Sequence, residues 1–408
     1  MYVCGPTVYD FAHIGNARPV VVFDLLYRLL GEKYGTDHVT YARNITDVDD
    51  KIMVRAKESG VSIKELTTTT TEYFHQDTDA LGVLRPDHEP RATDYIPHMI
   101  ALIETLIEKN HAYAAEGHVL FHTPSMPDYG KLSRRSLDDM IAGARVEVAP
   151  YKKDSTDFVL WKPSSPDQVG WESPWGYGRP GWHIECSAMS GELLGTHFDI
   201  HGGGIDLMFP HHENEIAQSC CAHGTDYVNV WMHNGFLQIN GQKMSKSLGN
   251  FFTIRQLLQE KNIAGEVIRL LLLRTHYRQP LDWTDEAVTE CENILNKWFA
   301  KIEGLDITEA DLPDNVRDAL YDDMNMPLAI SHMHQLAPED LAKTLNFLGF
   351  KKTVKLGALS DRDIEDLLLQ RKEARKNKDF AKSDAIRDQL AADGVTIKDT
   401  REGTSWSR

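Results

Sequence analysis

Two thiols and a His-x-x-x-Glu pair are the residues of this sequence whose types could bind a metal ion. Cys4 and Cys186 lie in distant segments, and His211 and Glu215 are four residues apart. An α-helix turns through about 3.6 residues, so His211 and Glu215 would project from one face of a helix. Zinc accepts thiolate, imidazole and carboxylate ligands together. We therefore predict that these four side chains hold one zinc ion.

A short motif near the N-terminus could bind the phosphates of a nucleotide. Residues 13–16, His-Ile-Gly-Asn, fall between an expected strand and an expected helix. Gly15 would let the backbone approach a phosphate closely, the helix N-terminus would attract negative charge, and His13 could donate to phosphate oxygens. Asn16 closes the motif. Taken alone, the tetrapeptide also fits an ordinary turn with a capping histidine.

A lysine-rich loop adds to this pattern. Residues 243–247, Lys-Met-Ser-Lys-Ser, lie between Gly241 and Gly249. Lys243 and Lys246 could neutralise a triphosphate during nucleotidyl transfer, because such cations stabilise the charge of the transition state without covalent participation. A solvated basic loop would explain the lysines but not their pairing with the motif at 13–16. We therefore expect metal and nucleotide chemistry to share one pocket.

The composition predicts a soluble, multidomain protein. The chain has 408 residues, which is more than one core usually holds, so about two to four domains are expected. Hydrophobic residues make up 41% and charged residues 26%. No apolar stretch reaches the roughly 20 residues that span a bilayer, and the N-terminus lacks the basic and apolar regions of an export signal. We expect a cytoplasmic location and no membrane partner.

Cysteine usage and charge bear on the compartment and the partners. Five cysteines, an odd number, favour free or metal-bound thiols over a disulfide framework. Cys220, Cys221 and Cys291 have no ligand-like neighbours, so we expect buried structural thiols. The formal net charge of −17 counts against a nucleic-acid partner, yet a basic face can sit on an acidic body. One window is rich in basic residues, which a solvated helix would also explain: Arg371, Lys372, Arg375, Lys376, Lys378, Lys382 and Arg387.

The elements that must position these residues begin with a βαβ unit. Residues 2–8 read as a strand, residues 13–15 as a turn, residues 20–30 as a helix packed by one face and residues 38–42 as the next strand. A βαβ unit is the starting element of a parallel nucleotide-binding sheet. The turn falls where such sheets bind ligands, outside the carboxyl ends of the strands.

The rest of the chain predicts an insertion, a second half of the sheet domain and a helical region. Residues 95–109 read as a helix, and the proline-punctuated stretch 111–175 as short strands in an insertion. A strand at 197–201 is expected to end at the glycines 202–204. Helical apolar spacing then dominates, at 256–258, 267–273, 286–302, 328–336, 341–348 and, as a probable pair of helices, 361–390.

These motifs together resemble a known family. The turn at 13–16 and the loop at 243–247 are similar to the paired signatures of class I aminoacyl-tRNA synthetases. Over nearly its whole length the chain resembles the cysteinyl-tRNA synthetase family in particular. The segments that carry this closer resemblance are Met1–Asp10, Arg43–Asp47, Gly181–Ser187 and Phe209–Glu215.

The resemblance implies an α/β fold: a Rossmann-type parallel-sheet catalytic domain with an inserted subdomain, followed by a mainly helical C-terminal tRNA-binding region. The expected parts are 1–110, the first half of the catalytic domain; 111–175, the inserted connective subdomain; 176–242, the second half with the zinc site; 243–300, the signature loop and stem-contact region; 301–358, a helical anticodon-stem domain; and 359–408, a basic tail domain. The segment 322–327, which begins with two aspartates, resembles the family's acidic opening to the anticodon-stem domain.

The resemblance also implies an activity. L-cysteine would be activated with ATP, accompanied by Mg²⁺, to cysteinyl-adenylate and then transferred to tRNA(Cys) by a monomer. Zinc on Cys4, Cys186, His211 and Glu215 would bind the substrate thiolate, and His13, Gly15, Asn16, Lys243 and Lys246 would bind ATP. His13 and the two lysines would be catalytic. Thr46, Trp182, His201 and Asp206 would line the cysteine pocket, with Asp206 opposite the substrate ammonium.

Other sequence-based interpretations stay open. Without the resemblance, Trp182 fits a core aromatic and His201 a satisfied turn histidine, and the zinc could merely staple the fold. His212 and Glu213 lie beside the ligands at the wrong helical phase to join them, which favours a position behind the ligands or on the surface. The basic C-terminal helix could contact RNA phosphates, and Trp406 could stack on a base or pack on its own domain.

The sequence departs from the family pattern in two places, and it leaves two alternative functions open. Asn16 stands where histidine is typical, and an amide can donate a hydrogen bond but cannot carry charge. The sequence starts directly in the first expected strand, where family members normally carry a preceding segment. The related ligase that joins cysteine to an amino sugar in mycothiol synthesis would not need the basic tail. A non-catalytic zinc-stabilised RNA-binding protein would not need His13 and the two lysines.

Overall fold

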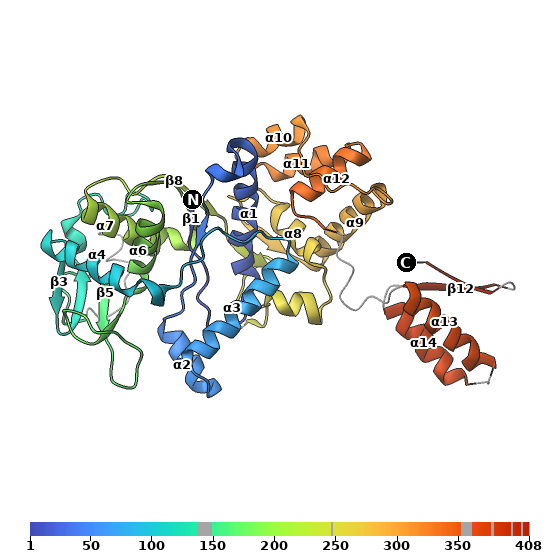
Figure 1. The fold of residues 1–408 in the computed structure, drawn as a ribbon, viewed down its shortest axis with the longest axis horizontal. Coiled ribbons are helices and arrows are strands. Elements are labelled where there is room, and N and C mark those ends of the chain that lie inside the picture. Colours follow the sequence, from blue (N-terminus) through green and yellow to red (C-terminus); the bar gives the residue numbers. More distant parts are fainter. Residues whose placement is uncertain are drawn as a thin grey trace. The chain divides into compact units, whose positions relative to one another are not determined.

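The computed structural model describes residues 1–136, 149–245, 248–351, 361–376, 379–392, 395–400 and 403–407. The chain forms two compact units, Met1–Lys351 and Lys352–Arg408 (Figure 1). Of the predicted site residues, Lys246 lies outside the described part of the chain. Among the described residues, no helix has the length and apolar character needed to cross a bilayer.

A four-stranded parallel sheet lies within the first unit. Its strand order is β2 (Ala42–Arg43), β1 (Tyr2–Val3), β7 (Phe198–Gly204) and β8 (Val228–Asn234). The chain proceeds from β1 to β2 in one direction and from β7 to β8 in the other, so the connections diverge between β1 and β7. Ligands of open parallel sheets bind at such a point, outside the carboxyl ends of the strands. The predicted Rossmann-type fold class is confirmed.

The first strand is shorter than the expected span 2–8. Pairing is interrupted after Val3 and resumes at Thr7, which bridges to Thr46. Pro6 has no N–H to donate, and a Cβ on Gly5 would lie 1.7 Å from the Asn44 carbonyl oxygen. Cys4 directly follows β1, and its N–H donates to the Gly202 carbonyl of β7 at 3.2 Å.

Helix α1 (Ile14–Tyr34) follows β1 and contacts β7 and β8. Its apolar residues, among them Phe23 and Leu25, are buried, as their helical spacing predicts. The helix begins earlier than expected, because the Asn16 amide oxygen accepts a hydrogen bond of 3.1 Å from the His13 N–H. Such a bond satisfies a backbone donor at the start of a helix. The motif at 13–16 is therefore the N-terminus of α1.

Gly202 to Gly204 continue strand β7, so the expectation that these glycines end the strand is wrong. They pair with residues 232–234 of β8. A Cβ on Gly202 would lie 2.3 Å from the ring of Phe23, and a Cβ on Gly203 would lie 3.0 Å from the imidazole of His212. The glycines are needed because helix α1 and the turn that holds His212 approach the strand closely.

An antiparallel sheet is inserted between α4 (Ile96–Glu108) and α6 (Trp182–Leu194). Its strands are β3 (Ala112–Ala115), β4 (His118–Phe121), β5 (Phe158–Pro163) and β6 (Gly178–Pro180). Helices α2 (Asp50–Ser59) and α3 (Ile63–Ala80) precede it, and α7 (Glu213–His223) lies between β7 and β8. Figure 1 shows α4, α6 and α7 beside the inserted sheet, on one side of the first unit.

The remainder of the first unit is mainly helical. Strands β9 (Leu237–Ile239), β10 (Gln242–Lys243) and β11 (Leu281–Trp283) form a small sheet. The helices are α8 (Gly265–Leu273), α9 (Asp285–Lys301), α10 (Asp314–Tyr321), α11 (Met326–Met333) and α12 (Pro338–Phe347). They share one apolar core with α1, which includes the predicted buried thiol of Cys291. Cys220 and Cys221 are only half-buried, against the core on the side of α4 and α6.

The second unit has its own small core. Helices α13 (Asp361–Lys376) and α14 (Phe380–Ala392) confirm the expected pair of helices, and β12 (Thr396–Thr400) pairs with β13 (Gly403–Ser407) as a hairpin. Trp406 packs against an apolar cluster of this unit that consists of Ile364, Ile386, Leu390 and Val395.

Candidate active site

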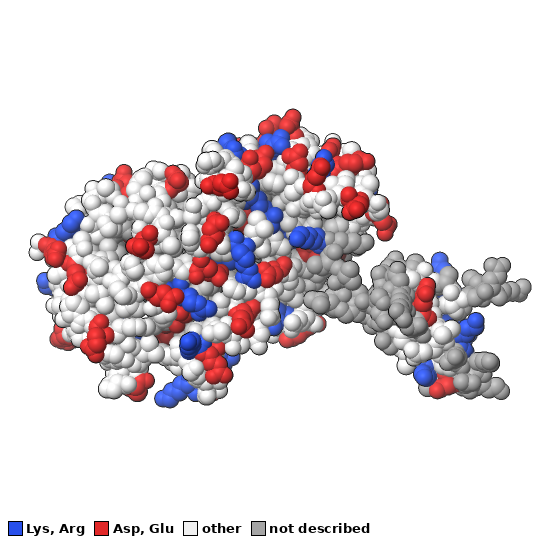
Figure 2. Space-filling view, viewed as in Figure 1, with Lys and Arg blue, Asp and Glu red and all other residues white. Residues whose placement is uncertain are grey.

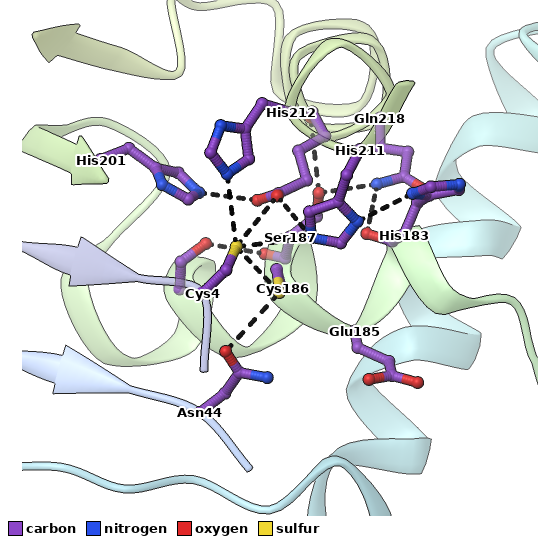
Figure 3. A network of polar contacts seen from close by, with 12 residues as sticks. Cys4, Asn44, His183, Glu185, Cys186, Ser187, His201, His211, His212 and Gln218 are labelled. Atoms are coloured by element: carbon purple, nitrogen blue, oxygen red, sulfur yellow. Dashed lines mark hydrogen bonds and ion pairs between the residues drawn. The ribbon is translucent and has the colours of Figure 1, made fainter. Parts of the chain in front are cut away.

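The four predicted metal ligands converge beyond the carboxyl ends of β1 and β7. Cys4 follows β1, Cys186 lies on α6, His211 lies in the turn Met208–His212, and Glu215 lies in the first turn of α7. The Cys4 Sγ lies 3.6 Å from the Cys186 Sγ, 3.4 Å from the His211 Nε2 and 3.5 Å from the Glu215 Oε1. The His211 Nε2 and Glu215 Oε1 are 3.0 Å apart. Figure 3 shows the labelled residues from these separate elements pointing toward one another.

The spacing of these four donor atoms fits a tetrahedral zinc ion. Bonds of about 2.3 Å to sulfur and about 2.0 to 2.1 Å to nitrogen or oxygen hold neighbouring ligand atoms about 3.3 to 3.8 Å apart. The three distances from the Cys4 Sγ, 3.4 to 3.6 Å, lie in this range, and the His211–Glu215 distance of 3.0 Å is slightly shorter. All four donor atoms lie within 4.8 Å of one another, and three of the residues are buried while Cys4 is half-buried. Two sulfurs, one nitrogen and one oxygen are a donor set that zinc accepts. The residues present therefore fit the predicted metal.

His211 is oriented by contacts on both sides of its ring. Its Nε2 faces the cluster, and its Nδ1 lies 2.9 Å from the Nδ1 of His183. The indole of Trp182 stacks on the ring at a centroid distance of 4.3 Å. Burial and the neighbouring His211 lower the pKa of His183 to about 3, so His183 is neutral and can accept a hydrogen bond. Such a partner fixes the tautomer that leaves the other nitrogen for a metal.

Glu215 presents one carboxylate oxygen to the cluster and anchors the other. Its Oε2 accepts hydrogen bonds from the His201 Nε2 at 2.8 Å and from the Tyr227 hydroxyl at 3.2 Å. Its Oε1 faces Cys4 and His211. Burial opposes ionisation, but His201 and His211 together hold the pKa of Glu215 well below its usual range. Glu215 is therefore a charged, oriented ligand at neutral pH.

The two thiols differ in their protonation. A hydrogen bond from the Cys4 thiol lowers the pKa of Cys186 to about 6, whereas burial raises the pKa of Cys4 above its usual value. Thiolates are the metal-binding form of cysteine. Cys186 is thus poised to bind a cation, and a bound cation would favour loss of the second proton from Cys4.

His212 is buried beside the four predicted ligands and contacts one of them, which fits the expected position next to the ligands and not the alternative position on the surface. Its Nε2 lies 3.5 Å from the Cys4 Sγ, and Cys4, His201, His212 and Glu215 form a second group of donors within 4.8 Å. The Cys4 thiol is thus in contact with the imidazoles of two adjacent histidines. Glu213 is buried as well, and its carboxylate accepts hydrogen bonds from the backbone N–H groups of Gly130 and Ser133 in the insertion.

The four residues predicted to line a cysteine pocket lie around the cluster, and their side chains differ in exposure. Thr46 is buried and donates to the Glu185 carboxylate at 2.9 Å. His201 is buried behind Glu215, while Trp182 is 42% exposed beside His211. Asp206 is exposed in the turn that follows β7. The structure thus places all four near the carboxyl ends of β1 and β7 or around the ligands.

The two predicted phosphate-binding segments meet although they are far apart in the sequence. His13 bridges to Thr253, just after the lysine-rich loop. A Cβ on Gly15 would lie 3.3 Å from the Met244 Cε, so the loop contacts the turn. Lys243 is exposed at the end of β10, and Lys246 lies outside the described residues. The pairing that the motifs suggested is present in the fold.

Sequence reasoning missed two contributors to the site. His183 lies three residues before Cys186 on α6, and helical periodicity could have placed both on one face. Glu185 is buried beside Thr46, and nothing in the local sequence distinguishes it from a surface glutamate. Burial raises the pKa of Glu185 well above its usual value.

Comparisons with known proteins assign the chain to a family. The family model "tRNA synthetases class I (C) catalytic domain" matches residues 1–293, and "Cysteinyl-tRNA ligase anticodon binding domain" matches residues 360–406. The cysteine–tRNA ligase of Beijerinckia indica is 55% identical over 432 aligned residues, which cover 100% of this chain and 94% of that protein. The chain belongs to the cysteine–tRNA ligase family. It is therefore a class I aminoacyl-tRNA synthetase, as the resemblance predicts.

A further member of the cysteine–tRNA ligase family agrees with this assignment, and a solved structure agrees with the fold. The cysteine–tRNA ligase of Rhodospirillum centenum is 57% identical and covers 100% of this chain and 94% of its own length. Mycobacterium tuberculosis methionyl-tRNA synthetase in complex with methionyl-adenylate has a TM-score of 0.59 at 15% identity, covering 91% of this chain and 84% of that one. At that identity the likeness supports the fold alone.

Proposed function

We propose that the protein activates L-cysteine with ATP and transfers it to tRNA(Cys), with zinc in the cysteine pocket as the basis of specificity. The observation that carries this proposal is the convergence of Cys4, Cys186, His211 and Glu215 beyond the carboxyl ends of β1 and β7. Membership of the cysteine–tRNA ligase family supports the overall reaction. We further propose that it acts as a cytoplasmic monomer.

The specificity argument rests on the chemistry of the donor set. A purely apolar pocket separates small side chains by only about one to three kcal/mol. A bound zinc ion would take the cysteine sulfur as a thiolate ligand and would discriminate against the hydroxyl of serine. Glu215, anchored through its Oε2, and His211, held between Trp182 and His183, would keep the ion in one geometry.

The remaining pocket residues would position the amino acid. We propose that Asp206, exposed after β7, pairs with the substrate ammonium, and that Trp182 and His201 shape the wall. Thr46 would contribute its hydroxyl from the segment that follows β2. These groups would orient the substrate carboxylate toward the α-phosphate of ATP, which is the main contribution of positioning to such a reaction.

ATP would lie between the two phosphate-binding segments. His13, Gly15 and Asn16 at the start of α1 would face one side of the triphosphate, and Lys243 and Lys246 the other. The contact between Met244 and the Gly15 backbone supports this arrangement. The positive charges would stabilise the transition state as pyrophosphate leaves, and Mg²⁺ would accompany ATP.

The C-terminal unit would bind the tRNA. Figure 2 shows basic and acidic side chains interspersed over the first unit, with acidic groups over α10 to α12, so this face of that unit offers no continuous basic surface. The exposed basic residues of the second unit include Lys372, Arg375, Lys382 and Arg387. Arg371 was expected on the same basic face, but its side chain is buried, so it is not available to an RNA phosphate. Lys378 lies outside the described residues. The boundaries of the six expected parts stay predictions.

The test combines metal analysis with an activity assay. We expect one zinc per chain and cysteine-dependent exchange of pyrophosphate into ATP that serine does not support. Aminoacylation of tRNA with labelled cysteine, compared with transfer to glucosaminyl inositol, separates the synthetase from the amino-sugar ligase. Binding of tRNA without any exchange would favour the non-catalytic RNA-binding alternative instead.

A single variant separates a substrate-binding zinc from a structural one. Cys186→Ser should abolish most cysteine activation and leave tRNA affinity close to the wild-type value, because tRNA binding would involve the other unit. Equal loss of both properties would indicate that the metal only supports the fold.

A further inference from the structure

A cluster of side chains joins helix α3 to the segment that follows the lysine-rich loop. The Arg255 Nε donates to the Asp77 Oδ1 at 3.2 Å, and its Nη2 donates to the Gln76 Oε1 at 2.8 Å. The guanidinium lies over the ring of Tyr73, 4.3 Å from its centroid. We call these four residues the α3 clasp.

Asp77 gives the clasp its strength. Its side chain is 3% exposed, and its Oδ2 accepts no hydrogen bond within the described part of the chain. A buried carboxylate is costly without a paired cation, so the burial of Asp77 favours the position in which Arg255 contacts it. The backbone at Arg255 is thereby tied to α3.

The backbone beside Arg255 pairs with the turn that carries His13. The Ile14 N–H donates to the Phe252 carbonyl at 3.0 Å, and the Ile254 N–H donates to the Ala12 carbonyl at 2.9 Å. These two bonds enclose His13 opposite Thr253. A shift of Arg255 would therefore move the backbone that holds the start of α1.

The same segment also holds the lysine-rich loop. The Asn250 side chain accepts from the Ser245 N–H at 2.8 Å and donates to the Lys243 carbonyl at 3.3 Å. Helix α3 reaches the other segment too, since the Thr70 hydroxyl donates to the Val8 carbonyl at 2.8 Å, ahead of His13. Helix α3 thus contacts both of the segments that are proposed to bind phosphate.

We propose that Arg255, held by Asp77, is a positioning residue for nucleotidyl transfer that fixes the lysine-rich loop relative to His13. This inference rests on the proposed function of those two segments in binding ATP. Arg255 itself touches no reacting atom. Its loss would leave the predicted zinc ligands and cysteine-pocket residues unchanged, because the clasp contains none of them. It would allow the two sides of the triphosphate site to move apart.

The test uses Arg255→Ala, Arg255→Lys and a matched control. Arg85→Ala removes an exposed ion pair, in which Arg85 lies 2.6 Å from Asp79 at the end of the same helix. In pyrophosphate exchange, Arg255→Ala should lower kcat by about tenfold or more, since small misplacements of reacting groups are costly, with KM for cysteine within about twofold. Arg255→Lys should recover part of kcat because lysine can still pair with Asp77. Arg85→Ala should match the wild type.

An unchanged kcat in Arg255→Ala would overturn the inference, as would a KM effect on cysteine alone or an equal loss in Arg85→Ala. If Arg255→Ala does not fold, Asp77→Asn, which keeps the shape and removes the charge, takes its place with the same expectation. Amide hydrogen exchange provides a readout without activity: Arg255→Ala should speed exchange at Ile14 and Ile254, and Arg85→Ala should not. A wild type without pyrophosphate exchange would refute the proposed function, while unchanged amide exchange would refute the clasp.

Discussion

The two oxygens of the Glu215 carboxylate have different tasks at the residue scale. His201 and Tyr227 bind the Oε2, which leaves the Oε1 directed at Cys4 and His211. His211 is arranged in the same way, with one nitrogen toward the cluster and the other toward His183. A ligand whose second polar atom is already bound cannot rotate away, so the cluster keeps its geometry before any metal arrives.

His183→Ala tests this orientation of His211. Loss of a hydrogen-bond partner behind a metal ligand typically costs about 10- to 100-fold in metal affinity, and we expect a fall in zinc affinity of that size. Competition with a chromophoric chelator measures it. His98→Ala, which removes a histidine exposed on α4, is the control and should bind zinc like the wild type. Equal affinities in the two variants would show that His183 does not orient His211.

At the element scale, the close contact of α1 with β7 decides where the site forms. Phe23 packs against the backbone at Gly202, which brings the N-terminus of α1 to the carboxyl ends of the strands. Strand β7 also stays paired with β8 at Gly202, Gly203 and Gly204. Glycine usually weakens a strand, but here the packing of α1 against β7 outweighs this preference, so the strand continues to Gly204.

Gly202→Ala should destabilise the fold by about 1 to 3 kcal/mol, because the new methyl group would overlap the ring of Phe23. Urea denaturation followed by circular dichroism measures the change. Gly191→Ala on α6 is the matched control, since a Cβ there meets nothing within 4 Å. In a helix, alanine is more stable than glycine by about 0.5 to 1 kcal/mol, so the control should be at least as stable as the wild type. A stable Gly202→Ala protein would contradict the packing argument.

At the scale of the whole molecule, a buried ion pair connects the sheet domain to the later helices. Asp24 on α1 contacts Arg269 on α8, which also donates to the Leu348 carbonyl at 2.7 Å after α12. Burial opposes ionisation of Asp24, but Arg269 and Arg28 lower its pKa below the ordinary value. The helical region of the first unit is thus tied to the helix that begins at His13.

Asp24→Asn should lower the free energy of unfolding by about 3 to 5 kcal/mol at neutral pH, because Arg269 would remain buried without its partner. Glu290→Gln, which breaks an exposed pair with Arg274, should cost less than about 1 kcal/mol. A lowered folded pKa stabilises the protein above the unfolded value of about 3.9. The difference between Asp24→Asn and the wild type should therefore shrink as the pH falls through the folded pKa. Unfolding curves measured down to low pH check this, and a difference independent of pH would contradict it.

The charge of the chain is divided unevenly between the two units. The chain carries 44 Lys and Arg against 61 Asp and Glu, but residues 352–408 carry 13 against 11. An acidic body repels RNA phosphates, so a slightly basic unit can direct RNA to its own surface. Net charge alone would have excluded a partner that the distribution of charge allows.

Replacement of Lys372, Arg375, Lys382 and Arg387 by glutamine should raise KM for tRNA and make it less dependent on salt. Each lost phosphate contact should reduce the slope of log affinity against log salt by about 0.7 to 0.9. Pyrophosphate exchange, which needs no tRNA, should stay unchanged and serves as the control. Aminoacylation measured at several salt concentrations tests the expectation, and an unaltered slope would remove these residues from the tRNA surface.

The sequence was enough to predict which four side chains converge, that the motif at 13–16 and the lysine-rich loop belong together, and that the sheet starts with a βαβ unit. Residue type and short spacing support the His211–Glu215 pair and the βαβ unit, whereas the grouping of Cys4 with Cys186 and of the two motifs rests on the family resemblance. Only the tertiary structure showed that His212 reaches Cys4, that Arg371 is buried, and that Gly202 makes room for Phe23. Such contacts join segments that are remote in the sequence, and short-range periodicity carries no information about which distant side chain will occupy the adjoining space.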